Sequence, residues 1–254
     1  MDLSWYDYTL IILAGTLAGV INTLAGNGSA ITLAIFTELL GLPGNVANGT
    51  NRIGVLCQTW AGSFVFYRNG KLELSRAKLN IILTCVGAIV GVAIAVVISN
   101  EHFMVIYKYL MLAVLAILLV RPKRWLDETD DQTEVSPWIA VPLFLLLGFY
   151  GGFIQMGMGI FYLAAVVLIS RYSIIEGNAL KTFVVGVYTL IVLLIFHYKG
   201  LVRWDLGLIM AIGQTAGGYF TAAFASKYPG ASKVAYVLLL VIVVIALYSL
   251  FFRS

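Results

Sequence analysis

Apolar residues occur in ten blocks along the chain, and short polar stretches separate the blocks. The blocks run at approximately 8–25, 29–40, 46–67, 77–98, 103–120, 137–156, 159–170, 177–198, 205–225 and 232–252. A helix needs about 20 apolar residues to cross the roughly 30 Å hydrocarbon core of a bilayer. Eight blocks are close to that length, but 29–40 and 159–170 have 12 residues each and would be only about 18 Å long as helices. The pattern predicts helical spans together with two half-helices, re-entrant segments or thinned spans.

The composition agrees with helices that cross a membrane. Hydrophobic residues make up 61% of the chain and charged residues only 11%, whereas soluble domains carry about 25% charged residues. The blocks do not alternate apolar and polar positions as barrel strands would. We therefore expect an all-α polytopic membrane protein, in which residues 1–254 form one transmembrane domain with 8–10 membrane segments. Because the first block follows the acidic stretch MDLSWYDY, we expect a retained span rather than a cleaved signal peptide.

Charge and cysteine content argue against several other classes. The net charge of +4 fits Lys and Arg at membrane edges better than a nucleic-acid surface. Cys57 and Cys85 lie inside apolar blocks, which indicates small buried thiols and neither a disulfide nor a metal site. No GxSxG, HExxH, P-loop or CxxC pattern occurs. We therefore expect neither an enzyme nor a bound cofactor.

A polar stretch divides the chain into two similar halves. Residues 121–136 contain no apolar block, so we expect a cytoplasmic linker between repeat 1 (about 8–120) and repeat 2 (about 137–252). Residues of the two halves match in order, at an offset of 133 in the first blocks and of 130 after a gap of three residues. The ordered series indicates an internal repeat. The matched pairs include Gly15/Gly148, Gly19/Gly152, Asn22/Gln155, Gly26/Gly159, Asn48/Asn178 and Gly87/Gly217.

Basic loops set the expected orientation. Loop 68–78 and the stretch 121–124 are rich in Lys and Arg, and such loops usually face the cytoplasm. If the short block of each repeat crosses the bilayer, each repeat has five crossings and the second repeat is inverted relative to the first. If the short blocks do not cross, there are eight spans and the N-terminus lies inside. We favour the inverted arrangement, because it keeps the acidic N-terminal stretch outside the cell.

Each repeat breaks its apolar run at a glycine-rich turn, AGNGSAI at 25–31 and QMGMGIF at 155–161. Every backbone N–H and C=O at membrane depth needs a partner, so a break is tolerated only beside protein or a water-filled cavity. Breaks at corresponding positions of two halves are the best sequence pointer to a transporter's substrate site. Glycine pairs such as Gly15 and Gly19 have the spacing of close helix packing, but a packing contact does not need Asn27 or Ser29.

A cation is predicted inside a span after each break. Asn48 of repeat 1 matches Asn178 of repeat 2. Arg52 follows the first of these residues and Lys181 follows the second. An ionisable side chain inside a span marks a functional site by default, because charge in hydrocarbon is costly. The alternative is that both cations lie close enough to the interface to extend to the lipid headgroups.

The breaks and the cations together predict a binding site for a small anion near the bilayer midplane. N–H groups at the start of a half-helix carry partial positive charge and suit an anion. The expected activity is secondary transport by alternating access of the two repeats, with proton coupling and the oligomeric state left open. An anion channel and a non-transporting partner subunit are the alternatives. The candidate substrate-binding residues are Asn22, Asn27, Ser29, Asn48, Asn51, Arg52, Gln155, Asn178, Lys181 and Thr182.

The glycine and asparagine motifs resemble those of a known family. The pattern G-x-x-x-G-x-x-N-x-x-x-G from Gly15 to Gly26 and the stretch LGLP-x-x-x-A-x-G-T-N from Leu40 to Asn51 are similar to the opening signatures of the TauE/SafE family of membrane transporters. The glycines that begin at Gly148 repeat the first of these patterns less completely in the second half. The resemblance covers about residues 8–252. It implies a multi-pass protein of the cell membrane that exports sulfite, thiosulfate, sulfonates or related anions.

Overall fold

The computed structural model describes residues 4–75, 77–96, 136–228 and 230–252, and all regular elements within these ranges are helices. The predicted block 103–120 and residues 121–135 of the predicted linker lie outside them. The described elements are α1 (Trp5–Leu24), α2 (Ser29–Ala34), the π-helix η1 (Ile35–Leu39), α3 (Gly44–Arg68), α4 (Lys78–Ala95), α7 (Pro137–Phe153), α8 (Met158–Leu168), α9 (Ile174–Tyr198), α10 (Trp204–Lys227) and α11 (Ala231–Phe252).

Within the described ranges, 4 helices are long and apolar enough to cross a membrane, namely α1, α4, α9 and α10. The two short blocks are short helices, as expected: α2 and η1 together cover Ser29–Leu39, and α8 covers Met158–Leu168. Helix α3 is 25 residues long but carries buried polar side chains, among them Asn51 and Gln58. The all-α membrane fold predicted from the sequence is confirmed for the described residues.

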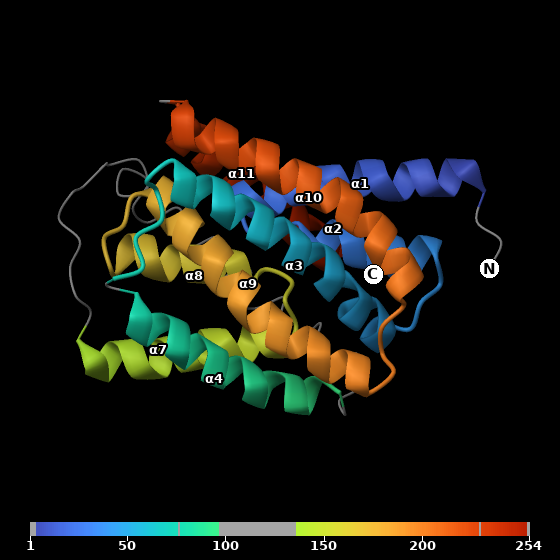
Figure 1. The fold of residues 1–254 in the computed structure, drawn as a ribbon, viewed down its shortest axis with the longest axis horizontal. Coiled ribbons are helices and arrows are strands. Elements are labelled where there is room, and N and C mark those ends of the chain that lie inside the picture. The colour runs from blue at the N-terminus through green and yellow to red at the C-terminus, as the bar shows by residue number, and fades with distance from the viewer. Residues whose placement is uncertain (1–3, 76, 97–135, 229, 253–254) are drawn as a thin grey trace.

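Helices α3 and α9 pack against each other in the centre of the molecule. Helices α4 and α7 pair on one side of them, and α1 and α10 pair on the other (Figure 1). Both outer pairs join helices from different halves, because the first helix of each predicted repeat packs on the fourth helix of the other repeat. The repeat boundaries and the inversion of one repeat relative to the other stay predictions.

Glycines bring the helices of the two outer pairs close together, as their spacing predicted. A Cβ atom at any of these positions would meet the backbone of the facing helix closer than van der Waals distance. The hydrophobic effect does not drive helices together inside a membrane. Small residues let the helix backbones approach closely, and the resulting van der Waals contacts hold the helices together. The glycines are Gly15, Gly19, Gly213 and Gly217 between α1 and α10, and Gly87, Gly91, Gly148 and Gly152 between α4 and α7.

The same contacts correct the predicted alignment of the first helices. Gly19 faces the carbonyl oxygen of Gln214, and Gly148 faces the carbonyl oxygen of Thr84. Because Thr84 and Gln214 match at the offset of 130, Gly19 is equivalent to Gly148 and not to Gly152. The offset in the first helices is therefore 129 and not 133. Glycines that recur every four residues allow an alignment to slip by about one helical turn.

The two breaks cross at the centre of the molecule. Gly26 in the first break has φ 84° and Gly157 in the second has φ 79°, in the left-handed region that glycine adopts without strain. A Cβ atom on Gly159 would lie 2.6 Å from the Cα atom of Gly26, so the two backbones touch and neither position has room for a side chain. The crossing brings the end of α1 and the start of α8 to the central helices α3 and α9.

Candidate functional site

Lys181 of α9 binds the open end of α1. Its ammonium donates to the carbonyl oxygens of Asn22 and Thr23, both at 2.9 Å, and to Oδ1 of Asn178 at 2.6 Å. Asn178 Nδ2 also donates to the carbonyl oxygen of Leu24 at 3.1 Å. The last carbonyl groups of a helix have no partner within the helix and carry partial negative charge. We call this arrangement, in which Lys181 and Asn178 satisfy those carbonyls, the Lys181 cap.

Arg52 of α3 binds the end of α7 in the corresponding way. Its Nη1 donates to the carbonyl oxygen of Gly151 at 2.9 Å, and its Nη2 donates to the carbonyl oxygen of Gly152 and to Asn48 Oδ1, both at 3.3 Å. Asn48 Nδ2 donates to the carbonyl oxygen of Phe153 at 3.2 Å. We call this the Arg52 cap. Arg52 is 0% exposed and Lys181 is 2% exposed, so the alternative that these cations extend to the headgroups is wrong.

No buried carboxylate balances these two cations within the described part of the chain. The buried polar and charged side chains there include no Asp or Glu. The salt bridge between Arg203 and Asp205 lies at the surface and includes no residue of either cap. Among the described residues, the positive charge of both caps is met by amide oxygens and by helix C-termini, which carry about half an elementary charge each, and at Arg52 also by the Phe196 ring. The part of the interior that the structure describes therefore has an excess of positive charge.

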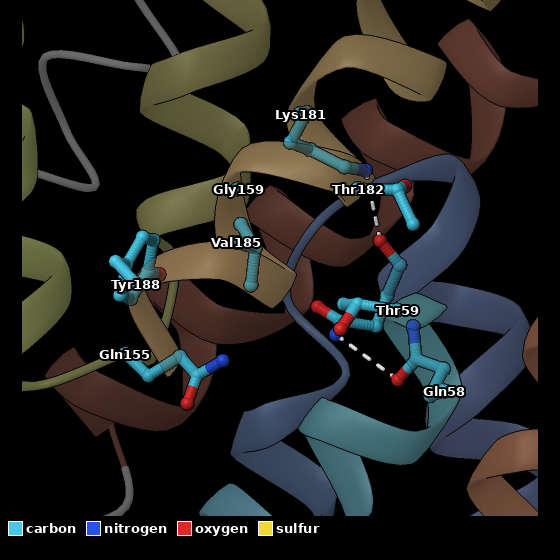
Figure 2. Close-up of a pocket in the computed structure, with 9 residues that line it drawn as sticks. Gln58, Thr59, Gln155, Gly159, Lys181, Thr182, Val185 and Tyr188 are labelled. Carbon is cyan, nitrogen blue, oxygen red and sulfur yellow. Dashed lines mark hydrogen bonds between the residues drawn. The ribbon is translucent and has the colours of Figure 1, made fainter. Parts of the chain in front are cut away.

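A small pocket lies beside the Lys181 cap, where the end of α1 and the second break meet α3 and α9 (Figure 2). Its free space is close to the size of one water molecule. Four of the predicted site residues line it. The lining residues are Asn22, Gln58, Thr59, Gln155, Gly159, Lys181, Thr182, Val185 and Tyr188.

The two sides of the pocket differ in how their polar groups are satisfied. On the α1 and α3 side, Asn22 Nδ2 donates to Gln58 Oε1 at 3.2 Å, and Gln58 Nε2 donates to Thr23 Oγ1 at 3.2 Å. On the opposite side, both amide atoms of Gln155 and the hydroxyl of Tyr188 are buried and have no hydrogen-bond partner among the described residues. Both side chains are labelled in Figure 2 among the residues that line the pocket. One side is a closed network, and the other side has free hydrogen-bonding groups.

The other predicted residues are buried but do not line the pocket. Asn51 Oδ1 accepts hydrogen bonds from Thr32 Oγ1 at 2.6 Å and from Gln214 Nε2 at 3.5 Å, which ties α2, α3 and α10 together. Asn48 and Arg52 form the Arg52 cap, and Asn178 belongs to the Lys181 cap. The hydrogen bonds of these three side chains therefore join helices. The predicted residues outside the pocket are Asn27, Ser29, Asn48, Asn51, Arg52 and Asn178.

Sequence reasoning missed Gln58, Thr59 and Tyr188 as pocket residues. A signal for each was present, because polar side chains in the middle of apolar blocks 46–67 and 177–198 are costly in a membrane. Tyrosine is common at the membrane interface, but Tyr188 lies far from either end of its block and is 0% exposed. Position within a block, and not residue type alone, identifies these residues.

An all-helical membrane fold with two broken helices that meet at a buried polar pocket defines the class of membrane transport proteins. The chain belongs to the family described as "Sulfite exporter TauE/SafE", whose family model matches residues 11–249. This confirms the resemblance seen in the glycine and asparagine motifs.

Relatives that share most of their length with this chain carry names of the same class. "Probable membrane transporter protein ORF9" of Sinorhizobium sp. is 26% identical over 230 residues, which are 88% of this chain and 85% of the relative. "Probable membrane transporter protein YfcA" of Escherichia coli K12 is 27% identical over 212 residues, 82% of this chain and 77% of the relative. A "Probable membrane transporter protein" of Xylella fastidiosa 9a5c is 22% identical over 224 residues, 87% of this chain and 85% of the relative. No solved structure matches the chain.

Proposed function

We propose that this protein is a secondary transporter of the cell membrane that exports a small sulfur-containing or organic anion, such as sulfite, thiosulfate or a sulfonate. The substrate would occupy the pocket beside Lys181, where the two breaks cross, once the pocket has widened beyond its present room for about one water molecule. The family description supports sulfite as the first candidate and export as the direction. The protein would act on its substrate by moving it and not by a chemical reaction.

The excess positive charge of the interior carries this proposal. Arg52 and Lys181 are buried, and no buried carboxylate of the described residues balances them. A bound anion would supply the missing negative charge, whereas a cation would be repelled. Gly159 brings the first turn of α8 to the pocket, and the N–H groups of such a turn favour an anion as well.

The size of the pocket favours a transporter over an anion channel. Room for about one water molecule is typical of an occluded site and not of an open pore. Each cap joins one repeat to the other, because Lys181 of repeat 2 binds α1 and Arg52 of repeat 1 binds α7. Rocking of one repeat against the other would change these bonds and open the pocket to one side at a time. In the inverted arrangement the two caps would control opposite sides.

Transport by purified protein in liposomes tests this function. Liposomes loaded with sodium sulfite should release it with saturation, and external sulfite should accelerate the release, as expected of a carrier. Lys181→Gln should lower the rate by at least about 100-fold, because a charge is worth several kcal/mol in a site of low dielectric constant. The matched control is Lys199→Gln at the exposed end of the same helix, which should transport at the wild-type rate.

Two outcomes would contradict parts of the proposal. Release that never saturates and that external sulfite does not accelerate would identify an anion channel. Wild-type transport by Lys181→Gln, at unchanged thermal stability, would remove Lys181 from the site. The same liposomes with a pH difference across the membrane test coupling to protons, since coupled transport would change rate with the direction of the gradient.

A further inference from the structure

The unsatisfied side of the pocket contains three polar atoms that the Lys181 cap does not use. Gln155 is 4% exposed and Tyr188 is 0% exposed. Neither the Gln155 amide nor the Tyr188 hydroxyl has a hydrogen-bond partner among the described residues, although the hydroxyl of Thr189 lies near Tyr188 without forming a bond of acceptable geometry. Buried polar groups are nearly always paired in folded proteins, and an unpaired one destabilises the fold. Both groups line the same pocket, so a ligand bound there can complete them.

Lys181 is poorly placed to make that contact itself. An ammonium group has three N–H donors, and all three acceptors of Lys181 belong to the protein: two carbonyls of α1 and the side chain of Asn178. A ligand could take a hydrogen bond from Lys181 only by breaking the cap. Lys181 can still attract an anion through its charge, which acts over several ångströms in a medium of low dielectric constant.

Neutral donors surround the same space. The Tyr188 hydroxyl and the Gln155 Nε2 amide can each donate to an oxygen atom. Gly159 lines the pocket in the first turn of α8, where backbone N–H groups have no acceptor within the helix. These three donors come from the second break, α8 and α9, and three separate donors fit a group with several oxygens on one central atom. Each oxygen of a pyramidal or tetrahedral head can then take one donor.

We propose that Tyr188, Gln155 and the N–H of Gly159 form the contact set that recognises the oxygens of a small oxyanion, and that Tyr188 determines specificity for such anions over a halide. This inference rests on the proposed function and names the chemical class that the site takes, a compact head such as sulfite or a sulfonate. Lys181 supplies charge and holds α1, and the neutral groups supply the direct hydrogen bonds.

Tyr162 of α8 provides a matched control for Tyr188. Both tyrosines are 0% exposed, and both hydroxyls lack a hydrogen-bond partner among the described residues. Only Tyr188 lines the pocket. Substitution of either residue by Phe removes one oxygen atom and keeps the ring, so the two variants should fold with similar stability. A difference between them in ligand binding therefore reports the pocket.

The test measures binding of sodium sulfite, sodium methanesulfonate and sodium chloride to detergent-purified protein by calorimetry, together with the melting temperature in the absence of ligand. Tyr188→Phe should weaken binding of both oxyanions by about tenfold or more, as the loss of one hydrogen bond to a charged ligand does. It should reduce the preference for oxyanion over chloride by the same factor. Gln155→Met, which has nearly the same volume, should behave likewise. Tyr162→Phe should bind as the wild type does.

The outcomes separate this inference from the proposed function. If wild-type protein in liposomes transports an oxyanion but Tyr188→Phe binds it as well as Tyr162→Phe does, the inference is overturned and the transporter stands. If Tyr188→Phe does not fold, equal oxyanion binding by Gln155→Met and the wild type overturns it. If the wild type neither binds nor transports any of the three anions, both the inference and the proposed function are overturned.

Discussion

The Arg52 cap and the Lys181 cap close equivalent helix ends with different side chains. Arg52 binds two carbonyls of α7 with the two terminal nitrogens of its guanidinium, and its Cζ lies 5.8 Å from the centre of the Phe196 ring. Lys181 binds two carbonyls of α1 with a compact ammonium and lines the pocket. A guanidinium is a broad planar group that stacks on aromatic rings, whereas an ammonium is a small point charge.

The difference between the two caps indicates that equivalent positions of the two repeats serve different roles, one in stability and one in transport. At the Arg52 cap an aromatic ring and a wide cation fill the space, and Arg52 does not line the pocket. At the Lys181 cap the smaller cation leaves room beside it, and the unpaired polar groups of Gln155 and Tyr188 line that space. We therefore expect substitutions at Arg52 to act mainly on stability and substitutions at Lys181 to act mainly on transport.

The largest effect on stability should follow from Arg52→Met. This change leaves buried carbonyls of α7 without donors, and hydrogen bonds to a charged group contribute about 1.5–3 kcal/mol each. We expect a loss of about 3 kcal/mol in the free energy of unfolding, measured by thermal unfolding in detergent. The folded fraction should keep its sulfite affinity within about tenfold, since Arg52 acts on the pocket only through its field.

Arg68→Met is the control for that variant. Arg68 lies on the same helix, with its Cζ 5.6 Å from the centre of the Phe64 ring, but it is exposed. Exposed charges of this kind contribute little, so its stability should stay within about 0.5 kcal/mol of the wild type. If Arg52→Met were as stable as Arg68→Met and lost sulfite binding, the division of tasks between the caps would be wrong.

A smaller loss of stability should follow from Gly26→Ala, at the crossing that both caps flank. Gly26 has φ 84°, and its Cβ would lie 2.7 Å from the Cα of Gly159. Gly70 also has a positive φ, 66°, but its Cβ would meet nothing within 4 Å. Gly70→Ala should cost about 1 kcal/mol from backbone strain alone, and Gly26→Ala about 2 kcal/mol or more from strain and overlap together. Equal melting temperatures would show that the crossing can relax freely.

The smallest effect should follow from exchanging one cation for the other at the Arg52 cap. Arg52→Lys keeps a positive charge and enough donors for the carbonyls of α7, so we expect a loss of about 1 kcal/mol in unfolding free energy. The reverse exchange, Lys181→Arg, should be tolerated less well, because the free space beside Lys181 is close to one water molecule. Transport by Lys181→Arg at the wild-type rate would show that the two caps are interchangeable.

The helical elements were predictable because each depends on a local pattern. Blocks 29–40 and 159–170 are close to the helices Ser29–Leu39 and Met158–Leu168, since apolar length and flanking glycines set these limits. Two buried cations were predictable for the same reason, as charge inside an apolar block is rare. The offset between the first helices was wrong because the glycines that define it recur once per turn.

The partners of the polar residues were not predictable from the sequence. Arg52 and Lys181 were expected to face a ligand, but both bind backbone carbonyls at the ends of distant helices. A carbonyl at a helix end has no residue type that marks it. The pocket brings together Gln58, Gln155 and Tyr188 from three separate helical blocks, and a single sequence does not contain those long-range contacts.

The exchange of outer helices between the halves also has a consequence for synthesis. Helix α1 packs on α10, and α4 packs on α7, so each early helix depends on a partner that the ribosome makes much later. A chain grows from its N-terminus, so the first half enters the bilayer with its glycine faces uncovered and must wait for the second. Neither half can form both outer helix pairs alone. A truncated product would leave the glycine faces of α1 and α4 exposed to lipid.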